Sequence, residues 1–127
     1  MAEAKQVIRP LSPHLQIYRP QITALSSIFI RITGLGMVAG ILLAVWWLLA
    51  AAVGPEYFAT ANAVATSWFG DLVFTGAMWA MWYHYLGGLR HLYWDTGKGL
   101  DMPTVNMLGW GMVIGSVVLT VLTLIII

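Results

Sequence analysis

The segment His84–Asp95 combines residue types that are rarely found together at the end of an apolar stretch. It reads His-Tyr-Leu-Gly-Gly-Leu-Arg-His-Leu-Tyr-Trp-Asp. An imidazole is costly inside hydrocarbon, so it usually marks a functional site there. His84, Gly88 and His91 are spaced by four and then three residues, and they share one face of a helix. Because the glycine leaves room for a large flat group, the pattern favours a haem whose iron is bound by His84.

A second interpretation of His84 needs no cofactor. Its imidazole could hydrogen-bond a neighbouring helix, while Gly87 and Gly88 tighten helix packing as small residues do in membranes. The residues alone leave both interpretations open.

The haem interpretation requires a second axial ligand from another source. Two axial ligands approach iron from opposite faces, whereas His84 and His91 lie on one face of one helix, about 10 Å apart along its axis. The remaining histidine, His14, lies in the N-terminal segment. We therefore expect a second histidine from another polypeptide, so that this chain holds half of a haem site. His91, beside Arg90 at the membrane edge, better fits a haem propionate or a lipid headgroup.

A second candidate site opens the first apolar run, where Ser27 and Arg31 are four residues apart and face the same way. A hydroxyl and a fixed cation can hold a quinone carbonyl and stabilise the negative charge that develops on reduction. Alternatively, Arg31 extends to the membrane interface and Ser27 bonds back to its own helix. Arg31 lies on the same side of the membrane as His84, so it is also a candidate contact at the haem edge. Tyr93 and Asp95 lie at that level and could pair with Arg90 or Arg31 or carry protons.

The elements that position these residues are three predicted membrane-spanning helices. The chain is 60% hydrophobic and 9% charged, against about 25% charged residues in soluble domains. Three charge-free intervals approach or exceed the roughly 20 residues of a span, and they place helices near 26–52, 67–91 and 104–126. We predict an all-α integral membrane protein with a surface segment over residues 1–22 and a transmembrane domain over residues 23–127. The two breaks contain Gly54-Pro55 and a glycine-rich stretch at 96–103.

The distribution of basic residues predicts the orientation. All six lie before or at the start of the first helix or around the second loop: Lys5, Arg9, Arg19, Arg31, Arg90 and Lys98. By the positive-inside rule, the N-terminus and residues 1–22 are cytoplasmic and the C-terminus is periplasmic. The first apolar run begins too late and is too long for a cleavable signal peptide, and the N-terminus does not resemble a transit peptide. These features favour a multi-pass protein of a bacterial inner membrane.

Two motifs resemble the cytochrome b556 membrane-anchor subunits of succinate dehydrogenase, respiratory complex II. The first comprises Arg9-Pro10-Leu11, Leu15, Ile22 and the segment 27–33, which reads Ser-Ile-Phe-Ile-Arg-Ile-Thr. The second comprises His84 and the segment 88–97, which reads Gly-Leu-Arg-His-Leu-Tyr-Trp-Asp-Thr-Gly. With the three-helix layout, the resemblance covers nearly the whole chain. It departs at Ile30, where the family usually has a histidine thought to lie near a haem propionate.

The resemblance implies a subunit that works in electron transport and the tricarboxylic acid cycle but does not itself oxidise succinate. His84 matches the axial ligand of a haem b shared with a second small anchor subunit, so that the chain forms half of a heterodimeric helix bundle. Ser27 and Arg31 match residues of the ubiquinone pocket. The chain would anchor a flavoprotein subunit and an iron–sulfur subunit, which carry the FAD and the clusters. This chain has no cysteine to ligate a cluster, and we expect no nucleic-acid partner and no catalytic residue of its own.

Two other functions share parts of this pattern. A fumarate reductase anchor has the same architecture and runs the reaction in the opposite direction. A small transporter subunit or an assembly scaffold would need no haem. The sequence does not fix the direction of the reaction.

Overall fold

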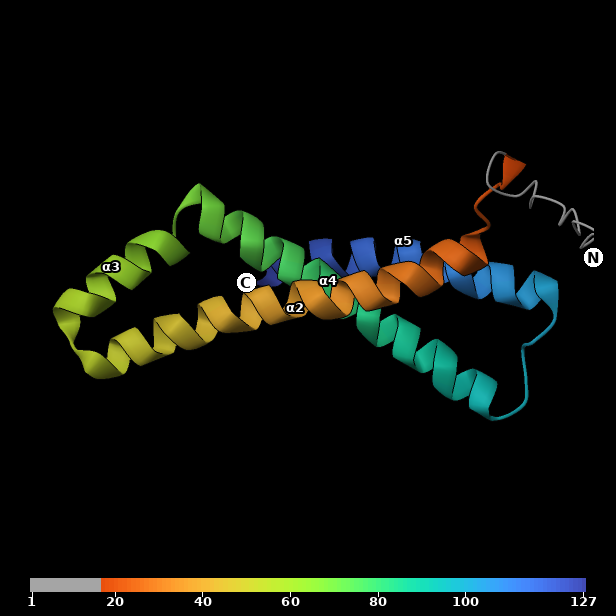
Figure 1. Cartoon of the computed structure of the whole chain (residues 1–127). Coiled ribbons are helices and arrows are strands. Elements are labelled where there is room, and N and C mark those ends of the chain that lie inside the picture. Colours follow the sequence, from red (N-terminus) through yellow and green to blue (C-terminus); the bar gives the residue numbers. More distant parts are fainter. Residues whose placement is uncertain (1–16) are drawn as a thin grey trace, which may run out of the picture.

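The computed structural model describes residues 17–127, in which all regular structure is helical (Figure 1). The helices are α2 (Ile22–Val53), α3 (Pro55–Ala65), α4 (Trp68–Asp95) and α5 (Met102–Ile126). The all-helical class is therefore confirmed, and the three long helices begin and end within about four residues of the predicted ranges, as is usual for helix ends. Of the predicted surface segment 1–22, residues 1–16 lie outside the described residues, and His14 is among them.

The short helix α3 was not predicted, because the sequence analysis expected only a break and a polar stretch there. Gly54 ends α2 with a φ of 151°, and Pro55 then occupies the first turn of α3, where its missing N–H costs nothing. Glu56 in the same turn complements the positive end of the helix dipole. The helix folds back on α2, where Trp46 Nε1 donates a hydrogen bond to Tyr57 Oη at 3.0 Å.

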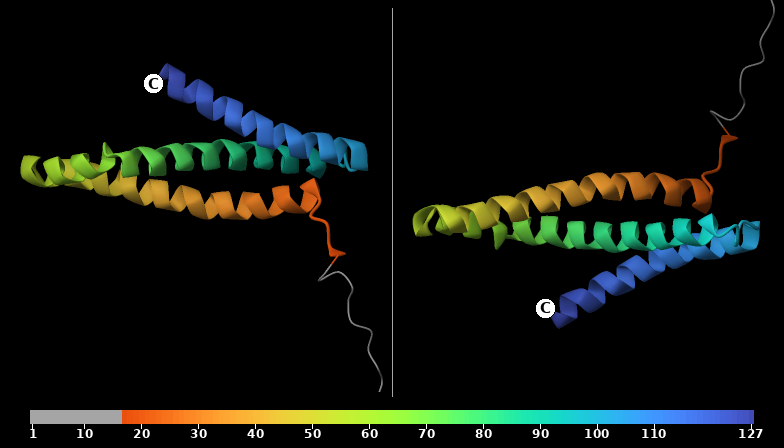
Figure 2. Two further views of the ribbon diagram at one scale, coloured as in Figure 1. Left: turned by 90° about the horizontal axis from the view of Figure 1, so that it is seen from above. Right: turned by 90° about the horizontal axis from the view of Figure 1, so that it is seen from below.

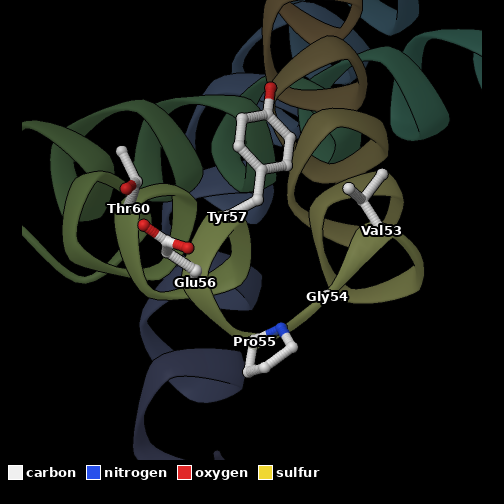
Figure 3. A pocket seen from close by; sticks show the side chains of 6 residues that line it. All are labelled: Val53, Gly54, Pro55, Glu56, Tyr57 and Thr60. Carbon is white, nitrogen blue, oxygen red and sulfur yellow. The ribbon is translucent and has the colours of Figure 1, made fainter.

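A hollow lies at the corner between α2 and α3. The hollow has a volume of about 520 Å³, and Figure 3 shows its lining residues, with the Tyr57 ring directed towards α2. It lies at the end of α2 opposite to its start, where Ser27 and Arg31 are found (Figure 1).

Helices α2 and α4 lie side by side because small residues occupy their contact (Figure 2). A Cβ atom on Gly40 would overlap the Cβ atom of Ala77, and one on Gly36 would lie 3.7 Å from the Cβ atom of Ala80. Close approach through small residues is the usual basis of helix pairing in membranes. Helix α5 packs against α4 and diverges from the pair towards its C-terminus (Figure 2).

The outward faces of the long helices are apolar, as expected of a protein whose solvent is lipid. Helices α2 and α5 are each long and apolar enough to cross a membrane, and in their most apolar windows only 11% and 22% of residues are buried. Helix α4 has 28 residues, which is long enough to span, but its polar and aromatic content keeps it below the same criterion. Within the described chain, α2 and α5 therefore have the length and hydropathy of membrane spans. The third predicted span, α4, remains a prediction.

The turn between α4 and α5 is fixed by glycines and a capping carboxylate. Gly97 and Gly99 have φ values of 75° and 69°, which side-chain-bearing residues rarely adopt. Asp101 is the N-cap of α5, and its Oδ2 accepts a hydrogen bond from the backbone N–H of Thr104 at 3.0 Å. That bond, with a further side-chain hydrogen bond to Thr104, holds the pKa of Asp101 below its usual range.

This lowered pKa predicts how the start of α5 responds to acid. A carboxyl whose pKa falls on folding stabilises the folded state above its unfolded value of about 3.9, and that contribution is lost as the pH falls through the folded value. We expect the Thr104 amide resonance of the solubilised protein to titrate with that lowered pKa. In Asp101→Asn, which caps without titrating, the resonance should not move over the same range. A Thr104 amide that titrates equally in both proteins would contradict the capping assignment.

Candidate functional site

His84 projects from α4 towards α2 with one ring nitrogen already engaged. Its Nδ1 lies 3.0 Å from the backbone carbonyl oxygen of Ile30. Because a carbonyl only accepts hydrogen bonds, Nδ1 is the donor in this contact, and in the neutral imidazole Nε2 then carries the lone pair that a metal needs. The ring also faces Gly34, where an added Cβ would lie 3.4 Å from His84 Cε1. The hydrogen bond from His84 to a neighbouring helix, which the interpretation without a cofactor expected, is therefore present. Because it uses Nδ1, it leaves Nε2 available to a metal.

The two adjacent glycines of α4 have different surroundings. Gly87 is buried, and a Cβ there would lie 2.8 Å from the Ile30 side chain and 3.1 Å from Met112 Cε. Gly88 is exposed, with nothing within 4 Å of an added Cβ. Gly87 thus serves helix packing, whereas Gly88 leaves open space one turn from His84. His91 is exposed, and its ring stands edge-on to Trp94 at 5.3 Å between centroids.

Ser27 and Arg31 are both exposed on α2. Four residues separate them, so they present one hydroxyl and one guanidinium on the same helical face. The backbone hydrogen bond that the alternative interpretation gave to Ser27 is instead made by its neighbour, because Ser26 Oγ donates to the Thr23 carbonyl oxygen at 3.1 Å.

Ser26 and Arg90 form a buried connection that the sequence analysis missed. The burial of Arg90 was not predicted: only 4% of it is exposed, and its Nη1 donates to Ser26 Oγ at 2.8 Å. Its guanidinium lies 4.6 Å from the centre of the Trp94 ring, a cation–π distance. Tyr83, also buried, donates to the Ser26 carbonyl oxygen at 3.3 Å. Arg90 therefore pairs with a hydroxyl and an aromatic ring within the described chain, and not with Asp95.

These residues fit one half of a haem site. The His84 imidazole has Nε2 free of hydrogen bonds and lies one turn from Gly88, which has open space around it. Its Nδ1 is hydrogen-bonded, and proteins commonly orient a ligating histidine through such a bond at the non-ligating nitrogen. The fold defines a helical membrane protein, and the chemistry of His84 is compatible with a metal ligand.

Comparisons with known proteins agree with that class. The family model described as succinate dehydrogenase/fumarate reductase transmembrane subunit matches residues 5–123. The chain belongs to this family. It is 52% identical to the succinate dehydrogenase cytochrome b556 subunit of Paracoccus denitrificans, over 99% of this chain and 97% of that one. It is 39% identical to the subunit of the same name in Rickettsia conorii, over 96% and 98% of the two chains.

A mitochondrial relative is more distant. The succinate dehydrogenase cytochrome b560 subunit of Sus scrofa is 36% identical over 80% of this chain and 61% of its own length.

The resemblance found in the sequence is thus confirmed: the chain is a succinate dehydrogenase membrane subunit of the cytochrome b556 type. The transporter and scaffold alternatives have no support.

The Ser26–Arg90 bond predicts that two adjacent serines behave differently. Ser26→Ala would leave a buried guanidinium without its acceptor, which costs about 1–3 kcal/mol. Ser27→Ala removes an exposed hydroxyl and should change stability by no more than about 0.5 kcal/mol. Thermal unfolding of the detergent-purified complex should show a lower midpoint for Ser26→Ala alone. Equal midpoints for the two variants would refute the role of Ser26.

Proposed function

We propose that the chain is the membrane-anchor and cytochrome b subunit of a succinate:quinone oxidoreductase, and that it supplies one axial ligand to a haem b shared with a second anchor subunit. The observation that carries the proposal is the bond from His84 Nδ1 to the Ile30 carbonyl oxygen, which leaves Nε2 for iron. The cytochrome b556 name of the relatives supports haem b as the group. When bound, a haem accepts and donates single electrons.

The residues around His84 determine how this chain would hold the haem. The Ile30 carbonyl fixes the ring orientation, and Gly88 keeps the adjoining surface clear. Because residue 30 is isoleucine, its side chain cannot bond a propionate. Two exposed basic residues of the same end, Arg31 and His91, are the proposed contacts for that part of the haem edge.

The quinone site of the proposal uses Ser27 and Arg31. Both are exposed on the first turns of α2, at the end of the molecule that also holds the end of α4 (Figure 1). The guanidinium and the hydroxyl would donate hydrogen bonds to a quinone carbonyl and stabilise charge as it is reduced. Ubiquinone is the substrate that the resemblance implies.

In this proposal α4 is the second of three membrane spans. Its support is the packing of α4 against both α2 and α5, the two helices that meet the hydropathy criterion. The proposed orientation has this end in the cytoplasm and the C-terminus in the periplasm. It is supported by four basic residues at the end where α2 and α5 begin: Arg19, Arg31, Arg90 and Lys98.

The partners of the proposed complex are those that the family resemblance implies. A flavoprotein subunit with FAD would oxidise succinate, and an iron–sulfur subunit would pass electrons to the quinone at the cytoplasmic surface. The companion anchor subunit would supply the second haem ligand. The relatives described above all carry the succinate dehydrogenase name, which favours succinate oxidation over fumarate reduction.

The ligand role of His84 predicts a selective loss of haem. In His84→Leu, the complex should reach the membrane, but its reduced-minus-oxidised b-type absorbance should fall by most of its amplitude, because one axial bond is gone. His91→Leu is the comparison variant: it removes a proposed contact of the haem edge but no iron ligand, so most of the absorbance should remain. An unchanged spectrum in assembled His84→Leu complex would refute the assignment.

The quinone-site proposal predicts a separation of two activities. Arg31→Leu should lower quinone reduction roughly 10- to 100-fold, the equivalent of a charge-assisted hydrogen bond of about 1.5–3 kcal/mol. Succinate oxidation with an artificial soluble acceptor should be unchanged, since that reaction bypasses the membrane subunit. Ser27→Ala should give a smaller loss in the same direction. A parallel fall of both activities in Arg31→Leu would show failed assembly rather than a quinone contact.

A further inference from the structure

Arg90 is a buried cation whose hydrogen bonding is incomplete. With 4% of its surface exposed, it bonds Ser26 through Nη1 and faces the Trp94 ring, while Nε is buried without any partner in the described chain. Neither Ser26 nor Trp94 carries a negative charge. A buried charge without a counter-charge is expensive, so the surroundings of Arg90 call for an acceptor that carries one.

Arg90 also lines an apolar cavity between α4 and α5, of about 400 Å³. Its walls include Leu86, Leu89 and Tyr93 from α4 and Met107 and Gly111 from α5. A long apolar wall with a single cation suits an amphiphile that has an anionic head and a hydrocarbon chain. A small hydrophilic anion would leave the apolar walls without a partner.

The position of the cavity along the bundle fits the headgroup level of a bilayer. Arg90 lies five residues, or about 7.5 Å, before the end of α4. Lys98 follows in the adjoining turn, and Arg19 precedes α2 at the same end. Basic pockets between transmembrane helices on the cytoplasmic side attract anionic headgroups, and Tyr93 and Trp94 are residues typical of the interface.

The cavity faces away from the candidate haem side of α4. Leu86 and Tyr93 are two and nine residues after His84, which places both roughly opposite it at about 100° per residue. If the companion subunit covers the His84 face, as the proposed function requires, the α4–α5 cavity is turned towards lipid.

We propose that this cavity is a binding site for one anionic phospholipid, whose phosphodiester accepts hydrogen bonds from Arg90 and whose acyl chain lies along the apolar walls. The lipid supplies the charge that Arg90 lacks and joins α4 to α5 where α5 begins to diverge from the bundle (Figure 2).

The test fills the cavity without altering Arg90. An added Cβ on Gly111 meets nothing within 4 Å, so the side chain in Gly111→Leu enters the cavity. Gly76→Leu is the matched control, because Gly76 is also helical, exposed and free of neighbours within 4 Å, yet lies outside the cavity. The intact complex is purified in mild detergent, incubated with phosphatidylglycerol vesicles, re-isolated and analysed by native mass spectrometry.

We expect the wild type and Gly76→Leu to retain about one more phosphatidylglycerol per complex than Gly111→Leu. Equal retention in all three proteins would overturn the proposal. So would a spectrum in which Gly111→Leu loses a bound quinone and keeps the phospholipid. The b-type spectrum of the same samples reports the proposed haem function separately. Its absence from all three would refute the haem site, whereas its presence with equal lipid retention would refute only the lipid site.

Discussion

The close approach of α2 and α4 is the constraint on which the other features of the molecule depend. Gly40 and Ala77 allow it, and Gly34 extends it to the level of His84. Only at this separation can an imidazole on α4 reach a backbone carbonyl on α2. The bonds from Tyr83 and Arg90 to Ser26 cross the same contact one to two turns further along. The small residues therefore determine both how the helices pack and how the histidine is presented.

Adjacent residues on the two helices divide structural and chemical roles. Ser26 is buried and accepts from Arg90, whereas Ser27 is exposed beside Arg31. Gly87 fills a packed contact, whereas Gly88 faces open space. A rotation of about 100° per residue is enough to move one member of each pair inward and the other outward. The buried bond between Ser26 and Arg90 thus fixes the helices that carry the exposed residues proposed to bind haem and quinone.

The sequence predicted the features that depend on composition and missed those that depend on contacts. Long apolar runs locate the three long helices to within about one turn. An imidazole in such a run makes His84 the candidate ligand, which stays a prediction. Helix α3 was missed because Gly54-Pro55 and a polar composition were interpreted as a loop, although a proline also fits the first turn of a helix. The burial of Arg90 was missed because a lone arginine near a helix end normally extends to the interface. Its partner, Ser26, is a residue 64 positions away.

His84 bonds to a main-chain carbonyl oxygen, that of Ile30. The hydrogen bond therefore does not depend on which side chain occupies position 30. Any side chain at that position offers the same carbonyl, so isoleucine in place of the histidine usual in the family changes the surface proposed for the haem edge and leaves the hydrogen bond to the His84 ring unchanged. The side chain is not free to vary independently, however, because Ile30 packs against Gly87. Positions 30 and 87 should therefore covary in size across homologous chains, while the hydrogen bond itself leaves no trace in the sequence.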